Sequence, residues 1–240
     1  MSASVLLQAV DELCQALAAL RFAQPVTHVY NPLIYARSGH EVYLRRYAQG
    51  KKRVLFLGMN PGPWGMAQTG VPFGEIPAVR DWMRIEEAIQ KPDPEHPKRP
   101  IHGFACVKSE VSGRRLWGLF AERYPNPGDF FADHFVINYC PLIFMEDSGR
   151  NRTPDKLPAE EIAAFQTPCD RHLARCIEIL EPEWLVGVGS YAEAAFRRVA
   201  PEVAPQARIG RVLHPSPASP VANRDWSGTA SRQLRDQGIW

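Results

Sequence analysis

Four short apolar runs, each followed by a turn, constrain the fold of this chain more than any other feature of its sequence. They cover residues 54–58, 135–139, 184–188 and 209–213. Each run is continuous rather than alternating, which is the pattern of a strand buried on both faces of a parallel sheet. Helical patterns lie between the runs, so we expect a three-layer α/β/α sandwich around a central four-stranded parallel sheet. No linker divides the chain, and residues 1–240 are expected to form one domain.

Apolar residues at intervals of three or four predict the helices of the outer layers. The proline-rich segment 91–100 is expected to be a long surface loop, because its prolines forbid a helix. The predicted helices cover residues 5–20, 76–90, 113–123, 158–180, 191–199 and 229–236.

The charge balance does not by itself indicate a nucleic-acid partner. Lys and Arg number 28 against 26 Asp and Glu, a formal net charge of +2, whereas phosphate binders usually have a clear basic excess. The charge is unevenly distributed, however. Residues 208–235 contain five Arg and one Asp, and residues 42–53 contain five basic residues and no acidic one, whereas residues 155–183 are acidic. The segments beside the first and fourth runs are therefore basic, whereas the long predicted helix before the third run is acidic, which a solvated helix face would explain equally well.

The cysteines and the apolar content indicate an intracellular protein without a cofactor. Five cysteines, with no C-x-x-C pair, favour neither a disulfide framework nor a metal site, and no histidine cluster suggests one. No apolar run approaches the roughly 18 residues that span a bilayer, and the N-terminus lacks a secretory pattern. We expect no cofactor, no metal and no membrane partner.

The four strand ends carry the residues of chemical interest, because ligands of an open parallel sheet bind beyond its carboxyl edge. The sequences there are MNPG (59–62), NYCP (138–141), GSY (189–191) and HPSP (214–217). The first belongs to GMNPGPWGMAQTGVPFG (58–74), with five glycines and three prolines in seventeen residues. This stretch matches neither G-x-G-x-x-G nor G-x-x-x-x-G-K-[ST], so a nucleotide-binding turn is not indicated.

These motifs resemble the single-strand-selective monofunctional family of the uracil-DNA glycosylase superfamily. The resemblance rests on residues 58–74, on the strand that ends at Asn138 and on LHPSP (213–217). It implies an enzyme that flips a damaged base out of DNA and hydrolyses its N-glycosidic bond, leaving an abasic site without cutting the strand. It extends over most of the chain from about Tyr30 onward, through VRDWM (79–83), EHPKRP (95–100), SEVSG (109–113), SGRN (148–151) and VGVG (186–189).

The resemblance implies two catalytic residues. Asn60 corresponds to the residue that orients the attacking water, and His214 to the residue that stabilises the departing uracil anion. An amide cannot act as a general base at neutral pH. Bond cleavage must therefore run ahead of water attack, through an oxocarbenium-like sugar, so that the water needs only to be positioned.

The resemblance also implies a base pocket. Asn138 reads N3–H and O4 of uracil, which requires an unidentified group that stops its amide from flipping, and Phe73 stacks on the base. Gly62 to Met66 would face C5, where the glycines leave room for a water. A hydroxymethyl group would replace that water and a methyl group would not, so we expect 5-hydroxymethyluracil as a second substrate and thymine as none. The expected substrate-binding residues are Gly58, Met59, Gly62, Met66, Phe73 and Asn138.

A rigid loop after His214 is expected to enter the DNA in place of the flipped base. Ala218 and Ser219 stand where the family usually has Arg and Asn, and Arg224 stands for Lys, so we expect a stronger preference for single-stranded over duplex substrate. Ser190, at a predicted helix start, would contact a phosphate, although a plain strand-to-helix turn explains this segment equally well. The expected partner of this monomer is single- or double-stranded DNA with uracil or oxidised pyrimidines. The expected DNA-binding residues are Pro215, Ser216, Pro217, Ala218, Ser219, Pro220, Asn223, Arg224 and Ser190.

Two other functions use the same strand ends. A nucleoside or nucleotide hydrolase would need acidic residues for ribose hydroxyls or a metal, and the four strand-end motifs supply none. A module that only captures flipped bases would be favoured if Asn60 and His214 were missing, and both are present.

Overall fold

The computed structural model describes residues 2–240, and at its centre lies the predicted parallel sheet. Its strands are β2 (Val54–Gly58), β3 (His134–Asn138), β6 (Trp184–Val188) and β7 (Arg208–Val212), in the order β3-β2-β6-β7. All three neighbouring pairs are parallel, and every residue of β2 is buried. The three-layer fold is confirmed, and each strand begins within one residue of its predicted start.

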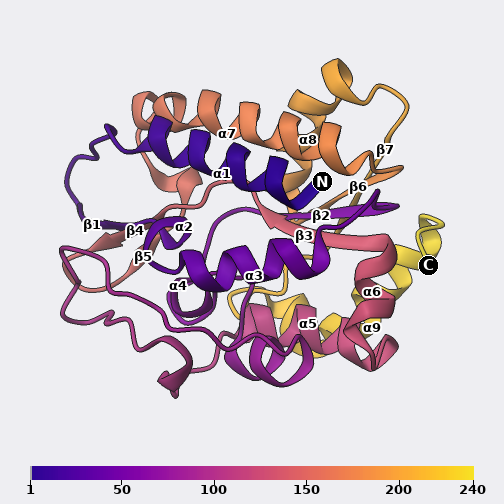
Figure 1. Cartoon of the computed structure of the whole chain (residues 1–240), viewed down its shortest axis with the longest axis horizontal. Coiled ribbons are helices and arrows are strands. Elements are labelled where there is room, and N and C mark those ends of the chain that lie inside the picture. The colour runs from indigo at the N-terminus through magenta and orange to yellow at the C-terminus, as the bar shows by residue number, and fades with distance from the viewer. Residues whose placement is uncertain (1) are drawn as a thin grey trace.

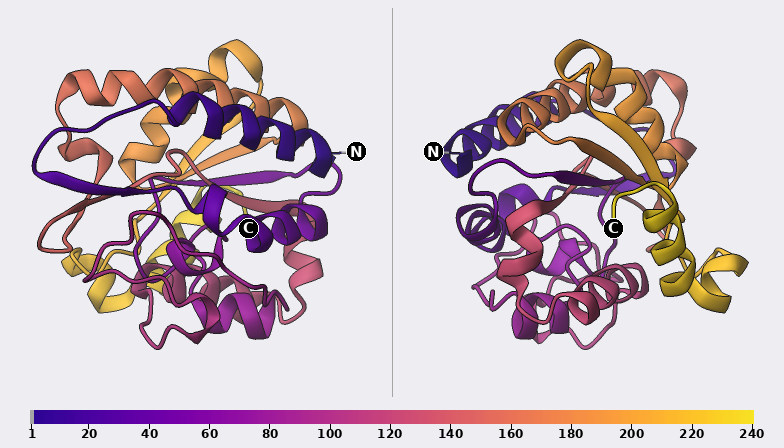
Figure 2. Two further views of the ribbon diagram at one scale, coloured as in Figure 1. Left: turned by 60° about the vertical axis from the view of Figure 1, so that its left-hand side comes forward. Right: turned by 90° about the vertical axis from the view of Figure 1, so that its right-hand side faces the viewer.

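Helices cover both faces of this sheet, as Figure 1 and the two turned views of Figure 2 show. The long helix α7 lies beside α1 and α8 on one face, and α3, α5, α6 and α9 lie on the other. The bounds are α1 (Ser2–Leu17), α3 (Arg37–Tyr47), α5 (Val111–Arg123), α6 (Pro127–Asp133), α7 (Ala159–Leu180), α8 (Ser190–Val203) and α9 (Pro220–Asp236).

A second sheet, absent from the sequence prediction, lies beside the first. It is antiparallel, in the order β1-β4-β5, with β1 (Val26–Tyr30), β4 (Ile143–Glu146) and β5 (Asn151–Arg152). Met145 pairs with Asn151 in this sheet. The turn between β4 and β5 places the residues after Asn151 close to the carboxyl edge of the central sheet, where they line the cavity described below.

One predicted helix is wrong, and another is confirmed but begins earlier than predicted. Residues 76–90 form a single π turn, η1 (Ala78–Trp82), and Arg84 then has a φ of 56°, which ends the helical conformation. The helix predicted from residue 229 begins instead at Pro220 and is interrupted at Asp225 (φ −162°). The prediction missed α3 and α6. It also missed the short helices α2 (Pro32–Tyr35), α4 (Met66–Thr69), η2 (Gly103–Ala105) and η3 (Pro154–Lys156).

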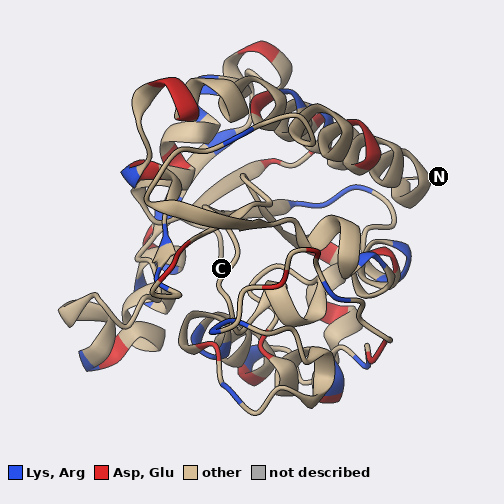
Figure 3. Ribbon diagram, turned by 90° about the vertical axis from the view of Figure 1, so that its left-hand side faces the viewer, with Lys and Arg blue, Asp and Glu red and all other residues tan. Residues whose placement is uncertain are grey.

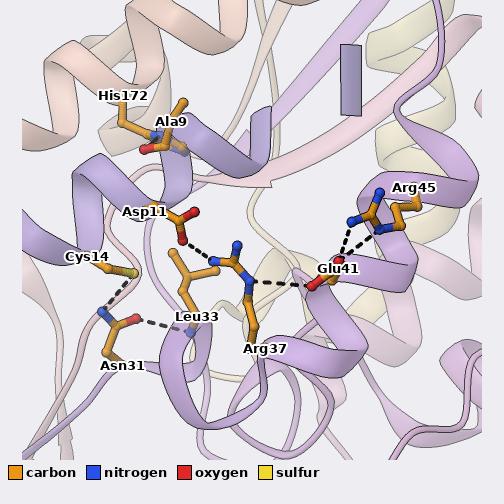
Figure 4. A network of polar contacts seen from close by, with 9 residues as sticks. All are labelled: Ala9, Asp11, Cys14, Asn31, Leu33, Arg37, Glu41, Arg45 and His172. Carbon is orange, nitrogen blue, oxygen red and sulfur yellow. Dashed lines mark hydrogen bonds and ion pairs between the residues drawn. The ribbon is translucent and has the colours of Figure 1, made fainter. Parts of the chain in front are cut away.

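Polar contacts attach the first helix to α7 beside it and to α3 on the other face of the sheet, as the close view in Figure 4 shows. Arg37 of α3 donates to Asp11 at 2.6 Å, and the His172 ring of α7 is bonded to the Ala9 carbonyl at 3.2 Å. The apolar side of α1, which includes Leu6, Val10 and Leu13, is buried in the core. α1 is therefore a packed part of the fold.

Basic and acidic positions are interspersed along the ribbon in Figure 3. Ion pairs such as Arg198–Asp170 (2.7 Å) and Arg175–Glu178 (2.8 Å) join opposite charges on and beside the acidic helix α7. Within residues 2–240, no helix is both long enough and apolar enough to cross a membrane.

Candidate active site

The carboxyl ends of three central strands bring the predicted site residues together. β2 and β3 end in register, with Gly58 beside Asn138, and their pairing continues where the amide of Cys140 donates to the carbonyl of Met59 at 2.9 Å. β7 ends two residues before His214. A cavity of about 130 Å³ opens at this edge. It is lined by Met59, Asn60, Pro61, Gly62, Phe73, Glu110, Ser112, Asn151, Thr153 and His214.

The Asn60 amide is oriented by the backbone. Its Nδ2 donates to the carbonyl of Leu142 at 3.2 Å, in the segment that leads from β3 into β4. The carbonyl oxygen Oδ1 thereby points away from that bond and is left as an acceptor. An amide held in this way can position a water through the water's own hydrogen without removing a proton.

His214 is held as a neutral hydrogen-bond donor. The backbone N–H of Ser216 donates to its Nδ1 at 3.1 Å, so the ring hydrogen is on Nε2. Burial lowers the pKa of His214 to about 4, which keeps the ring uncharged at neutral pH. Gly189 supports the ring from the turn after β6: a Cβ built there would lie 3.2 Å from that of His214. The Nε2–H is thus available to an oxygen in the cavity.

Asn138 and Phe73 meet over Gly58. A Cβ built on Gly58 would overlap with Oδ1 of Asn138 and would lie 2.7 Å from Cζ of Phe73, so glycine is required there. Oδ1 of Asn138 is buried and has no hydrogen-bond partner within the described chain. An unpaired buried acceptor costs free energy unless a ligand fills it. Phe73 has a φ of 53°, a strained conformation for a bulky residue, and its ring centroid lies 6.3 Å from that of His214.

The structure supplies a group that orients the Asn138 amide. Its Nδ2 donates to the sulfur of Met66 at 3.3 Å. A thioether sulfur can accept but cannot donate a hydrogen bond, so this contact favours the NH₂ group on the Met66 side. Met66 and Asn138 are not in the lining of the cavity that holds Asn60 and His214; they line a separate cavity of about 30 Å³.

The loop after His214 is braced from α5. Arg115 donates to the carbonyl of Pro215 and to Oδ1 of Asn223, both at 2.9 Å, and Nδ2 of Asn223 donates to the carbonyl of Pro217 at 2.8 Å. Ser219 caps α9 by accepting from Ala222 at 3.3 Å. The loop is therefore stiffened by hydrogen bonds as well as by its prolines.

The loop tip is small and apolar. Pro217 and Ala218 are exposed, Pro220 is exposed at the first position of α9, and Pro215 and Ser216 lie deeper. Arg224 is exposed on α9, and Ser190 is the first residue of α8, outside the cavity lining. Their contacts with DNA stay predictions.

Four cavity residues were missed by sequence reasoning. Glu110 and Ser112 belong to SEVSG, and Asn151 belongs to SGRN, so two motifs of the resemblance pointed to them without giving them a role. Thr153, two residues after Asn151, also lines the cavity. The space beside Gly62 and Gly65, which was expected to hold a water, is occupied by the Glu110 side chain. No group of three or more metal-ligating side chains occurs in residues 2–240.

Comparisons with known proteins agree with this geometry. The chain is 48% identical over 223 residues to the single-strand selective monofunctional uracil-DNA glycosylase of Rattus norvegicus, with 93% of this chain and 80% of the rat protein covered. It is 47% identical over 229 residues to the Bos taurus protein of that name, with 95% and 83% covered. The crystal structure of wild-type Pedobacter heparinus SMUG2 superposes with a TM-score of 0.69 at 16% identity, covering 96% of this chain and 97% of that one, which shows a shared fold.

The family assignment follows from these matches. The model of the uracil DNA glycosylase superfamily matches residues 45–235, a range that includes the whole central sheet and every residue of the cavity lining. Because this range and the curated relatives both span most of its length, the chain belongs to the uracil DNA glycosylase superfamily.

Proposed function

We propose that this protein excises uracil from DNA by flipping the nucleotide into the cavity and hydrolysing its N-glycosidic bond. The observation that carries this proposal is the convergence of Asn60, Phe73 and His214 on one cavity at the sheet edge. A water-orienting acceptor, an aromatic face and a neutral donor are the three groups that the reaction needs. The whole chain, residues 1–240, would act as a single domain.

Cleavage begins at the glycosidic bond. As the bond between C1′ and N1 breaks, electrons move into the base and negative charge develops on O2. The Nε2–H of His214 stabilises that charge, as an oxyanion-hole donor does. Water held by Oδ1 of Asn60 then attacks C1′ of the oxocarbenium ion. The proton that this water loses passes to solvent, and the departing uracil anion takes up a proton, so the products are neutral uracil and the abasic site. No lysine lines the cavity, so no covalent link to the sugar forms and the strand is left uncut.

Asn138 selects the base. Its free Oδ1 accepts from N3–H of uracil, and the second hydrogen of its NH₂ group donates to O4. Cytosine presents an acceptor at N3 and a donor at C4, so each contact would become a clash of like groups. The buried position of Oδ1 makes this mismatch costly.

The DNA lies against the loop that follows His214. The exposed tip at Pro217 and Ala218 enters the space left by the flipped nucleotide, and the basic residues near α9 contact phosphates. Because Ala218 is short, it fills that space poorly, and we expect single-stranded substrate to be cleaved faster than duplex. The protein acts as an intracellular monomer on uracil and on oxidised pyrimidines such as 5-hydroxymethyluracil.

One experiment tests the proposal. End-labelled single-stranded oligonucleotides with one uracil, 5-hydroxymethyluracil, thymine or cytosine are incubated with the protein and then treated with alkali. Strand breaks are expected only after alkali and only at the first two bases, and Asn60→Ala and His214→Ala should each reduce them. The absence of alkali-labile sites in every oligonucleotide would contradict the proposal and favour a module that only captures bases.

A further inference from the structure

One carboxyl group in the cavity wall has no role in the mechanism described above. Glu110 immediately precedes α5 and lines the same cavity as Asn60, Phe73 and His214. The charged group that most affects it is another carboxylate, Glu75, rather than a cation. A carboxyl held in this way, mostly away from water and without a cation beside it, needs a hydrogen-bonding role to explain its position.

Two glycines make the space for this side chain. A Cβ on Gly62 would lie 2.7 Å from the carboxyl carbon of Glu110 and 2.9 Å from its Oε1, and a Cβ on Gly65 would lie 2.9 Å from its Cγ. Any other residue at these positions would force the carboxyl group to move. The spacing of the two glycines in PGPWG is therefore explained by the approach of Glu110 to the loop backbone.

The carboxyl group retains capacity to bind a further donor. Burial raises the pKa of Glu110, and the backbone N–H groups of Trp64 and Ser112 oppose that rise. A carboxylate has about four lone-pair positions, so two backbone donors leave it able to accept from a substrate or a water.

The position of Glu110 relative to the base follows by elimination. O2 of the base faces His214, and N3–H and O4 face Asn138, which leaves the C5–C6 edge. The NH₂ group of Asn138 contacts Met66, which follows Gly65 in the chain, and Gly65 packs on Glu110. C5, the ring atom next to the one that carries O4, therefore lies on the side of Gly65 and Glu110.

We propose that Glu110 determines which substituents at C5 are accepted. Its carboxylate accepts a hydrogen bond from a hydroxymethyl group at C5, or from a water in that place when the base is uracil. A methyl group would displace the water and leave the partly buried carboxylate without that donor, so thymine is rejected. The inference rests on the proposed function, since it assigns a further residue to the same base pocket.

The test compares cleavage rates of uracil and 5-hydroxymethyluracil in single-stranded DNA under single-turnover conditions. Glu110→Met keeps the length of the side chain and removes the acceptor. We expect the 5-hydroxymethyluracil-to-uracil rate ratio to fall by about 10- to 100-fold, the usual range for a hydrogen bond to a charged group, and thymine cleavage to become measurable. Glu110→Gln retains an acceptor, and its ratio should stay within about threefold of the wild type.

The controls separate substrate reading from support of the loop. Glu75→Gln alters a neighbouring buried carboxyl group that accepts from Ser109 outside the cavity lining, and it should leave the ratio unchanged. If Glu110→Met does not fold, Glu110→Asp withdraws the carboxylate by one methylene and should lower the ratio as well. A wild-type ratio in a folded Glu110→Met or Glu110→Asp, even with both rates reduced, would overturn the proposal. Failure of the wild type to cleave uracil would instead refute the proposed function.

Discussion

The neutral state of His214 predicts a cleavage rate that does not change across the ordinary titration range of histidine. Its Nδ1 accepts from the Ser216 amide, so the structure already assigns the ring hydrogen to Nε2. With a pKa of about 4, roughly 3% of the rings are protonated at pH 5.5, whereas about 90% of exposed histidines would be. The single-turnover rate of uracil release should therefore be flat from about pH 5.5 to 8.5.

The size of the contribution follows from what the donor does. A neutral N–H aimed at a developing oxyanion is typically worth about 2.7–4 kcal/mol, or about 10²- to 10³-fold in rate. His214→Leu removes the donor and should show that loss. His214→Gln places an amide N–H near the position of Nε2 and should recover part of it. Single-turnover conditions are needed, because they separate bond cleavage from release of the abasic product.

Two results would refute this reasoning. A wild-type rate that falls about tenfold per pH unit above pH 6.5, with a flat profile in His214→Gln, would show that the charged imidazolium is the active form. A His214→Leu variant within about fivefold of the wild type, with an unchanged melting temperature, would show that another group stabilises the base anion.

Three further predictions follow from contacts in and around the site. Met66→Leu removes the acceptor that orients Asn138, so the rate of uracil cleavage should stay within about threefold of the wild type while discrimination against cytosine falls about five- to tenfold. The measurement compares the cleavage rates of oligonucleotides that contain uracil or cytosine, with Met145→Leu, at another buried methionine, as the control. Unchanged discrimination in Met66→Leu would contradict the prediction. Arg115→Met removes two hydrogen bonds from the loop after His214 and should lower kcat/KM about tenfold on duplex DNA and by less on single-stranded DNA. The control Arg114→Met, at an exposed neighbouring residue, should leave kcat/KM unchanged on both substrates. Equal losses on both substrates in Arg115→Met would argue against a role of the loop in insertion. Burial lowers the pKa of His40 and His134 to about 4, so the stability that the two neutral rings contribute is complete above pH 6.5 and is lost as the pH falls toward 4. About 2 kcal/mol of unfolding free energy should be lost for each ring by pH 5. The melting temperature should therefore drop between pH 6.5 and 5, where most carboxylates are still ionised, and a constant melting temperature there would contradict the assignment.

The central sheet could be predicted because burial on both faces leaves a strong sequence signal. β2 is apolar along its whole length and has helical segments on either side of it, which few other structures would produce. The second sheet lacked such a signal. β5 has only two residues, and β1 mixes exposed and buried positions, so neither forms a recognisable apolar run. Their pairing is long-range and depends on the completed fold.

The mistaken helix at residues 76–90 shows how a correct pattern can mislead. Ile76, Val79 and Met83 are buried at the predicted helical spacing. These buried residues lie in and beside a single π turn, and the left-handed conformation of Arg84 then ends the helical geometry. The spacing of the apolar residues therefore indicates which side chains are buried and does not show a continuous helix. α3 is a helix that the sequence analysis did not predict, because its buried face includes Gly39, His40 and two tyrosines rather than a row of aliphatic residues.

From the fold pattern alone the site was predictable only where it is built from strand ends, and Phe73 was predicted only through the family resemblance. Asn60, Asn138 and His214 follow parallel strands, and the geometry of such a sheet brings those ends together without further information. Glu110 and Asn151 reach the same cavity from a loop and from the second sheet, whose positions depend on the rest of the fold. Gly62 and Gly65 were the local sign of this arrangement, and they were interpreted as open space. A glycine shows that something approaches the backbone closely, but it does not show what, and here the group that approaches is the carboxyl of Glu110, for which we propose a role at C5.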